Sequence, residues 1–141
     1  MDNLTIKEYI DINMNQIMEL YKSAQWTNYT NNPHMLESAL KHSLKILGAF
    51  AGNKLVGLIR VVGDGYSIIY IQDIIVLPEY QGQGIGKRLI FEIDELYAHV
   101  YQKVLLTDNK PKTKAFYESC GFSSSDKFNC MAFVKFKAQQ D

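Results

Sequence analysis

One glycine-rich turn carries the most recognisable chemistry in this sequence. Residues 81–86 read Gln-Gly-Gln-Gly-Ile-Gly; an apolar run ends just before them at Pro78, and a helical pattern begins directly afterwards. Glycines let backbone N–H groups approach a ligand closely, and the dipole of the following helix adds partial positive charge at its N-terminus. Strand, turn and helix start together predict an anion site, for which a phosphate-bearing ligand is the natural guest.

The spacing of these glycines distinguishes between known phosphate-binding motifs. The turn lacks the G-x-G-x-x-G spacing of dinucleotide-binding proteins, and the chain contains no G-x-x-x-x-G-K-[ST] P-loop. The turn resembles the Q/R-x-x-G-x-G/A signature of the GNAT superfamily of acyl-CoA-dependent N-acyltransferases, with Val76 and Pro78 where the family's strand usually ends. An ordinary glycine turn ahead of a helix is the alternative interpretation of the six residues.

Composition and charge limit the class of protein. A length of 141 residues is enough for one domain with a core, so we expect a single N-acetyltransferase domain over residues 1–141. Fifteen Lys and Arg balance fifteen Asp and Glu, so no nucleic-acid partner is expected. No apolar run approaches the ~18 residues of a membrane span, and the N-terminus lacks the features of a secretory signal.

The cysteines and histidines give no sign of a disulfide-bonded or metal-binding protein. Cys120 and Cys130, with three scattered histidines, form neither a disulfide framework nor a zinc pattern. We therefore expect a reduced, cytoplasmic protein with no metal and no membrane partner, and a homodimer stays open.

Hydrophobic periodicity predicts the elements that position the turn. We expect strands over 4–10, 47–51, 54–62, 67–76 and 104–107, helices over 14–24, 33–44, 85–100 and 109–120, and closing strands over 122–123 and 130–136. Asn13 and Gln16 suggest a capping box, residues 25–32 a loop, and Gly121 a helix C-terminus. The strand–helix–strand connection around 85–100 predicts one parallel pair in an otherwise antiparallel sheet.

A second stretch strengthens the resemblance. Residues 115–122, Ala-Phe-Tyr-Glu-Ser-Cys-Gly-Phe, are similar to the GNAT signature F-Y-x-x-x-G-F, and the element order β-α-α-β-β-β-α-β-α-β-β matches that fold. Over residues 4–136 the chain is identified as a member of this family. The resemblance implies an α+β fold of the three-layer type, with a mixed, mostly antiparallel sheet of about six to seven strands flanked by four helices.

The family's activity supplies an expectation about the site. The resemblance implies transfer of an acetyl group from acetyl-CoA to an amine, which attacks the thioester directly in a ternary complex. Pyrophosphate is assigned to the glycine turn and pantetheine to the preceding strand end. The cofactor-binding residues so implied are Ile74, Ile75, Val76, Gln81, Gly82, Gln83, Gly84, Ile85, Gly86, Lys87 and Asn109. Asn109 lies one residue before the family's usual asparagine position, which Lys110 occupies here.

Catalytic groups are carried over in part. Tyr117 matches the tyrosine that protonates the departing sulfur in many relatives; a core tyrosine beside Phe116 is the alternative. Some relatives place a general base where Tyr70 and Gln72 stand, and neither is a base at neutral pH.

We therefore expect the proton to leave through water, with Asp73 or the more distant Asp64 taking part. Strict alternation puts the side chain of Asp73 on the opposite face of its strand from Gln72 and Ile74. A structural hydrogen-bond acceptor is the alternative role for Asp73.

The acceptor substrate is the least specified part of the prediction. Trp26 and Tyr29 lie in the segment that roofs the acceptor pocket in the family, where aromatic walls would suit an aryl or alkyl amine or a cation. Capping the core is their alternative role. The leading hypothesis is an N-acetyltransferase for a small amine. A non-catalytic acyl-CoA-binding module and an enzyme acetylating a protein or peptide amine are the alternatives.

Overall fold

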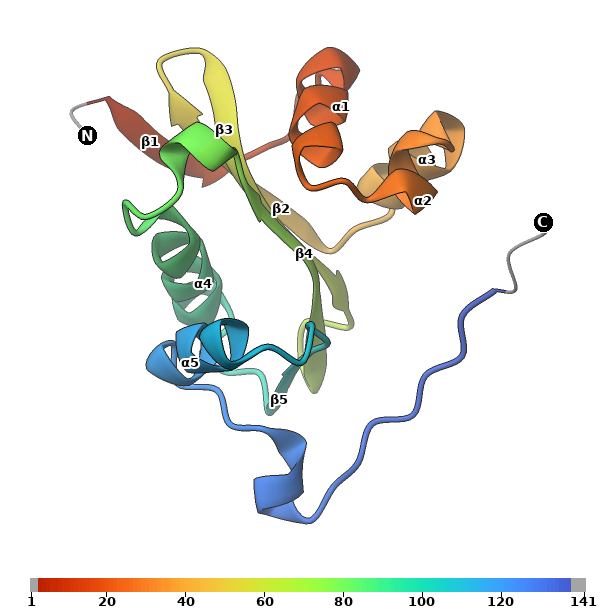
Figure 1. The fold of residues 1–141 in the computed structure, drawn as a ribbon, viewed down its shortest axis with the longest axis vertical. Helices are drawn as coiled ribbons and strands as arrows, with labels where there is room; N and C mark the ends of the chain where they lie inside the picture. Colours follow the sequence, from red (N-terminus) through yellow and green to blue (C-terminus); the bar gives the residue numbers. More distant parts are fainter. Residues whose placement is uncertain (1–2, 138–141) are drawn as a thin grey trace. The chain divides into compact units, whose positions relative to one another are not determined.

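A computed structural model describes residues 3–137 (Figure 1). The chain divides between Leu106 and Thr107 into two compact units, and each is described by itself. The expectation of a single domain over residues 1–141 stays a prediction.

The first unit is built on a sheet of five strands in sequential order (Figure 1). These are β1 (Leu4–Glu8), β2 (Lys45–Ala51), β3 (Lys54–Gly63), β4 (Ile68–Val76) and β5 (Gln102–Leu105). β1 to β4 pair antiparallel, and β5 runs parallel to β4, as expected for two strands joined through a helix. The predicted mixed, mostly antiparallel sheet is confirmed.

Four helices flank this sheet: α1 (Met14–Ser23), α2 (Thr27–Thr30), α3 (Pro33–Lys41) and α4 (Ile85–Leu96). In Figure 1, α4 lies on one side of the sheet and α1 to α3 on the other. Gly57 of β3 lets α4 pack closely, since a Cβ there would lie 3.2 Å from a methyl carbon of Ile85. Apart from Arg60 and Asp73, the core is apolar, with Ile17, Leu20, Leu36, Leu58, Ile59, Ile69, Leu89, Ile90 and Ile93 almost fully buried.

The start of α1 follows the prediction only in part. Asn13 is the N-cap, and its Oδ1 accepts hydrogen bonds from the N–H groups of Asn15 and Gln16. The capping box is wrong, because the Oε1 of Gln16 accepts from the Leu55 N–H of β3 at 2.6 Å. The stretch predicted as a loop over 25–32 contains the short helix α2.

A bulge in β4 decides which way its side chains point. Val61 pairs with Ile71 and Arg60 with Asp73, so Gln72 is an extra residue without a partner across the ladder. Gln72 and Asp73 both hydrogen-bond to the hydroxyl of Tyr29, so they share a face of the sheet. The expectation that Asp73 lies opposite Gln72 is wrong, because the bulge interrupts the two-residue alternation.

The second unit contains α5 (Pro111–Ser119) and a 3₁₀ helix, η2 (Ser125–Phe128). Gly121, with a φ of 94°, follows α5, and the N–H of Phe122 bonds the carbonyl of Tyr117 at 3.0 Å. Gly121 N–H bonds the Glu118 carbonyl, which completes a Schellman motif and confirms the predicted helix end.

The predicted closing strands over 122–123 and 130–136 are absent from the described residues, which form five strands rather than six to seven. A strand needs a partner edge for its backbone groups, and the helical segments of this unit offer none. The described chain has one more α-helix than predicted, namely α2.

Candidate active site

The glycine turn contains a run of backbone N–H groups that bond no protein atom in the described chain. Gly82 and Gly84 have φ values of 78° and 81°, the left-handed region that glycine adopts without strain, and Gly84 caps α4. Among the described residues, none of the N–H groups from Gly82 to Lys87 donates to another protein atom in a hydrogen bond. A Cβ added at either glycine would meet no atom within 4 Å. These N–H groups can therefore donate hydrogen bonds to an anionic ligand on the open side.

The charges around the turn favour the same kind of ligand. The first turn of α4 carries no acidic residue, and Lys87 and Arg88 are exposed there. Positive side chains at the positive end of a helix dipole are unfavourable on their own and become favourable beside a bound anion. The residues present thus fit a phosphate-bearing group.

Gln81 behaves differently from the rest of the turn. Its backbone N–H bonds the carbonyl of Pro78 at 3.2 Å, within the 3₁₀ helix η1 (Pro78–Tyr80). Its side-chain amide donates to the carbonyl of Val76 at 3.0 Å. Gln81 therefore ties the turn to the end of β4.

The end of β4 presents a backbone edge that has no strand partner in the described chain, apart from the bond between the Gln81 side chain and the Val76 carbonyl. The ladder between β4 and β5 ends at Ile71 and Leu105, which leaves Gln72 to Val76 without a strand partner on that side in the described chain. The N–H of Leu77 bonds Val56 of β3, so alternation turns the backbone groups of Ile74 and Val76 to the open edge and those of Ile75 toward β3. An extended amide-bearing arm could pair with this edge.

A buried polar network joins strands β3 and β4 to helices α1 and α2. Asp73 is 2% exposed and its Oδ2 accepts from the Nε of Arg60 at 2.7 Å and the hydroxyl of Tyr21 at 2.8 Å. Its Oδ1 accepts from the hydroxyl of Tyr29 at 3.2 Å. That hydroxyl in turn accepts from the Nη2 of Arg60 at 3.0 Å and the Nε2 of Gln72 at 3.2 Å.

The network shifts the protonation of its members. Burial, together with the charge of Asp73, raises the pKa values of both Tyr21 and Tyr29. Burial alone would lower the pKa of Arg60, but the adjacent carboxylate outweighs it and the pKa is raised. The tyrosines therefore stay neutral donors and Arg60 stays a cation at neutral pH.

The expected acceptor residues lie against this network. Tyr29 is buried in α2, and the guanidinium of Arg60 lies 5.9 Å from its ring centroid, so the protein's own cation occupies one ring face. Trp26 is half-buried, with its ring centroid 6.1 Å from that of Tyr21 and 6.3 Å from that of Tyr29. Tyr29 is thus buried and Trp26 lies nearer the surface, and their part in an acceptor pocket stays a prediction.

Asp64, the other predicted carboxylate, organises a turn. Its Oδ1 accepts from the N–H groups of Tyr66, Ser67 and Ile68, and its Oδ2 accepts from the Ser67 hydroxyl. These hydrogen bonds, that of the Ser67 side chain first, lower the pKa of Asp64. Its hydrogen-bond donors all come from residues 66–68, and none comes from the Asp73 network or the glycine turn.

Tyr117 lies in the C-terminal half of α5. Its ring centroid is 5.0 Å from that of Phe116 and 6.1 Å from that of Phe122. Burial and the neighbouring Cys120 raise the pKa of Tyr117, and a hydrogen bond with Thr107 opposes this shift. The phenol is therefore protonated at neutral pH, as a proton donor must be. Asn109 is exposed ahead of α5, whose N-cap is Lys110.

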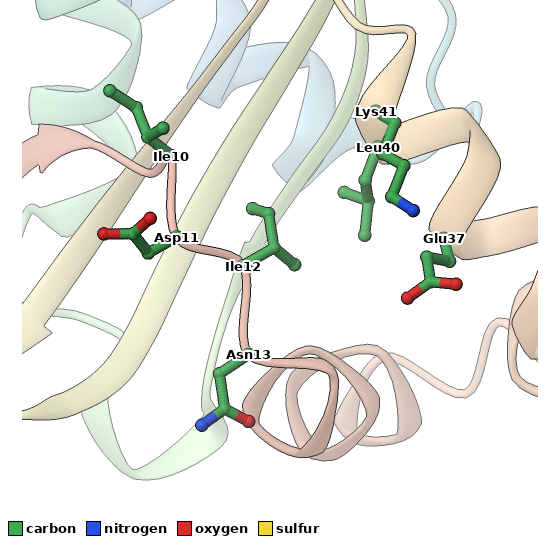
Figure 2. Close-up of a pocket in the computed structure, with 7 residues that line it drawn as sticks. All are labelled: Ile10, Asp11, Ile12, Asn13, Glu37, Leu40 and Lys41. Carbon is green, nitrogen blue, oxygen red and sulfur yellow. The ribbon is translucent and has the colours of Figure 1, made fainter.

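A hollow of about 680 Å³ opens elsewhere on the first unit, between the segment joining β1 to α1 and helix α3 (Figure 2). It is lined by Ile10, Asp11, Ile12, Asn13, Glu37, Leu40 and Lys41. None of these is a predicted site residue.

Residues 3–137 contain no cluster of three or more His, Cys, Asp or Glu side chains suited to a metal ion. No helix in the same range has the length and apolarity needed to cross a membrane.

Comparison with known proteins identifies the fold family. A model of the acetyltransferase (GNAT) domain matches residues 9–137. The chain belongs to the GNAT acetyltransferase family. This confirms the predicted membership and fold class, including the mixed sheet with flanking helices.

Solved GNAT structures agree along the chain. A GNAT-family acetyltransferase from Streptococcus pneumoniae is 40% identical, with a TM-score of 0.86 over 96% of this chain and 99% of that one. Among curated proteins, an uncharacterized N-acetyltransferase of Pyropia yezoensis is 27% identical over 79% of this chain. Glucosamine 6-phosphate N-acetyltransferase of Trypanosoma brucei brucei is 32% identical over 45% of it. The chain spans 66% of the Pyropia protein and 43% of the trypanosome enzyme.

Sequence reasoning about this GNAT protein missed Arg60 and Tyr21 and gave Gln72 no role. One signal was present: Arg60 interrupts the apolar run of β3, and Asp73 interrupts that of β4. Two opposite charges in adjacent buried strands indicate an ion pair, because an unpaired buried charge is too costly.

Proposed function

We propose that the protein transfers an acetyl group from acetyl-CoA to the amine of a small molecule. The observation that carries the proposal is the run of free N–H groups from Gly82 to Lys87 at the start of α4, next to the unpaired edge of β4. Bound acetyl-CoA would supply the thioester that the amine attacks.

The cofactor contacts follow from the backbone. The amides of Gly82, Gln83, Gly84, Ile85, Gly86 and Lys87 would hold the pyrophosphate, and each charge-assisted hydrogen bond contributes roughly 1.5–3 kcal/mol. Ile74 and Val76 would pair with the pantetheine amides, and Gln81 would hold the turn against β4. Ile75 would act from the core, since its side chain is buried and its backbone groups face β3. Asn109 stays a proposed contact of the second unit.

Proton handling falls to two groups. The Tyr117 hydroxyl would donate its proton to the leaving sulfur, a role that its raised pKa supports by keeping it protonated. Both oxygens of Asp73 are held by three donors, which favours a structural and positioning role over that of a base. The amine's proton would then leave through water.

The small-amine acceptor rests on two supports. Net charge is zero, which disfavours an RNA-borne acceptor. A relative aligned over 45% of the chain is a glucosamine 6-phosphate N-acetyltransferase, so an amino sugar is one member of the class to test.

The test is release of free thiol from acetyl-CoA with a panel of acceptors: phenethylamine, cyclohexylamine, glucosamine, spermidine and a tripeptide. Turnover with a small amine supports the proposal. Turnover with the tripeptide alone would favour a peptide acetyltransferase. Acetyl-CoA binding without turnover on any acceptor would favour a non-catalytic acyl-CoA-binding module.

A further inference from the structure

The direction of every hydrogen bond at the Tyr29 hydroxyl can be worked out from its neighbours. Asp73 is a carboxylate beside a guanidinium, so it only accepts, and the single proton of Tyr29 must point to its Oδ1. Arg60 only donates, and its Nη2 takes one lone pair of the Tyr29 oxygen. The lone pair that remains can bind only a donor.

That remaining position fixes the side-chain amide of Gln72. The NH₂ group of Gln72 must face the Tyr29 oxygen, and it lies there at 3.2 Å. The reversed amide would place two acceptors against each other. The carbonyl oxygen Oε1 of Gln72 is therefore held away from the network, as an acceptor on an exposed side chain.

The position of Gln72 in β4 suggests what its Oε1 could bind. Gln72 is the extra residue of the β4 bulge, and β4 loses its β5 partner immediately before it. The same open edge continues to Ile74 and Val76, where the proposed function puts the acyl-bearing arm of the cofactor. A fixed, neutral hydrogen-bond acceptor thus lies at the start of that edge.

We propose that Gln72 is a specificity-determining residue of the acceptor site, and that Tyr29 is a positioning residue that acts through it. The Oε1 of Gln72 accepts a hydrogen bond from the acceptor molecule, either from the N–H of the reacting amine or from a neighbouring O–H. This inference rests on the proposed function.

The chain offers a matched control for the network. Tyr21 and Tyr29 both donate to Asp73, but only the Tyr29 hydroxyl touches Gln72. Tyr29→Phe and Tyr21→Phe each remove one hydroxyl from the same carboxylate. Only the first frees the Gln72 amide to rotate.

The experiment compares wild type, Gln72→Met, Tyr29→Phe, Tyr21→Phe and the double variant Gln72→Met/Tyr29→Phe, with each panel amine that the wild type acetylates. Gln72→Met keeps the side-chain length and removes the acceptor oxygen. We expect the acceptor KM to rise about three- to tenfold in Gln72→Met and Tyr29→Phe, the scale of one lost hydrogen bond. The double variant should be no worse than Gln72→Met, and the KM for acetyl-CoA should stay constant.

Glucosamine and cyclohexylamine separate the two possible donors. A loss confined to glucosamine assigns the hydrogen bond to a hydroxyl, and an equal loss on both assigns it to the amine N–H; either supports the inference. Equal acceptor KM changes in Tyr21→Phe and Tyr29→Phe, or an unchanged KM in Gln72→Met, would overturn it while leaving the proposed function standing. Failure of the wild type to acetylate any panel amine would overturn both.

Discussion

At the scale of single residues, the proposed chemistry would depend on groups held in one protonation state or one conformation. Tyr117 is a neutral phenol packed between two rings, and Gly84 holds a left-handed backbone at the start of α4. Each can be tested by a substitution that removes one property and keeps the rest.

Replacing Tyr117 with phenylalanine keeps the ring contacts and removes the only proton that the side chain can give. Turnover should fall by roughly 10²–10⁴-fold if the hydroxyl is the general acid. Acetyl-CoA affinity should barely change, because the sulfur gains charge only during the reaction. Steady-state kinetics with direct binding measurements provide the check, and Tyr101→Phe, at a side chain 91% exposed, is the control. A parallel loss of affinity would instead make the hydroxyl a ground-state ligand.

Replacing Gly84 with alanine puts a Cβ where the turn is open and strains a backbone with a φ of 81°. We expect acetyl-CoA binding to weaken by about tenfold or more, and stability to fall by roughly 1–2 kcal/mol. Gly52→Ala is the matched control, since Gly52 also has a positive φ of 61° and no atom within 4 Å of the added carbon. Calorimetric titration of both variants checks the prediction. If Gly52→Ala weakened acetyl-CoA binding as much as Gly84→Ala, backbone strain rather than a contact at the turn would explain the weaker binding.

At the scale of elements, the polar network ties β3 and β4 to α1 and α2. The carboxylate of Asp73 and the guanidinium of Arg60 are 2% and 5% exposed, so each depends on the other to offset its burial. The contribution of this ion pair to the stability of the fold is measurable.

Asp73→Ala should lower the free energy of unfolding by about 3–5 kcal/mol, because it leaves the buried guanidinium and two hydroxyls without an acceptor. The double variant Arg60→Met/Asp73→Leu should recover the part of that loss that comes from the unpaired charge, while the two hydroxyls still lack Asp73 as an acceptor. Urea unfolding of Arg60→Met, Asp73→Leu and their double variant gives the coupling between the two sites. Additive losses would mean that the two charges stabilise the fold independently.

Alkaline pH should act on the same network. The folded-state pKa of Tyr21 is raised above its ordinary value near 10, so the folded chain keeps a proton that the unfolded chain releases. The raised pKa of Tyr21 therefore contributes its full amount to the free energy of unfolding below pH ~10. Above that pH the contribution falls by about 1.4 kcal/mol per pH unit. Unfolding measurements from pH 8 to 11 should show a shallower decline in Tyr21→Phe than in wild type. If stability fell equally steeply with pH in both proteins, the pKa of Tyr21 would not be raised in the folded state.

At the scale of the whole molecule, ligand binding should appear as stability. Acetyl-CoA at 100 times its dissociation constant should stabilise the native state by about 2.7 kcal/mol, and so raise Tm. NAD and ATP should do much less, because the glycine spacing fits neither dinucleotide nor P-loop binding. Thermal melts with the three ligands check this. A shift with NAD equal to that with acetyl-CoA would contradict the assignment of the turn.

What the sequence determined by itself was local in origin. The glycine turn, the cap at Asn13 and the end of α5 at Gly121 each depend on residues within one turn of chain, and all three are present. The apolar periods likewise predicted β1 to β5 and the parallel β4–β5 pair, because a buried face repeats at fixed spacing. The closing strands were predicted wrongly, since a strand pattern does not supply a partner edge.

Tertiary structure decided what depends on distant residues. The bulge at Gln72 arises from the pairing of β3 with β4, and it turned Gln72 and Asp73 to one face against the expected alternation. Asp73 is held by groups 13, 44 and 52 residues away along the chain. The orientation of the Gln72 amide follows only once α2 brings the Tyr29 hydroxyl to β4. Such contacts depend on register and helix docking, which a periodic pattern in one segment does not encode.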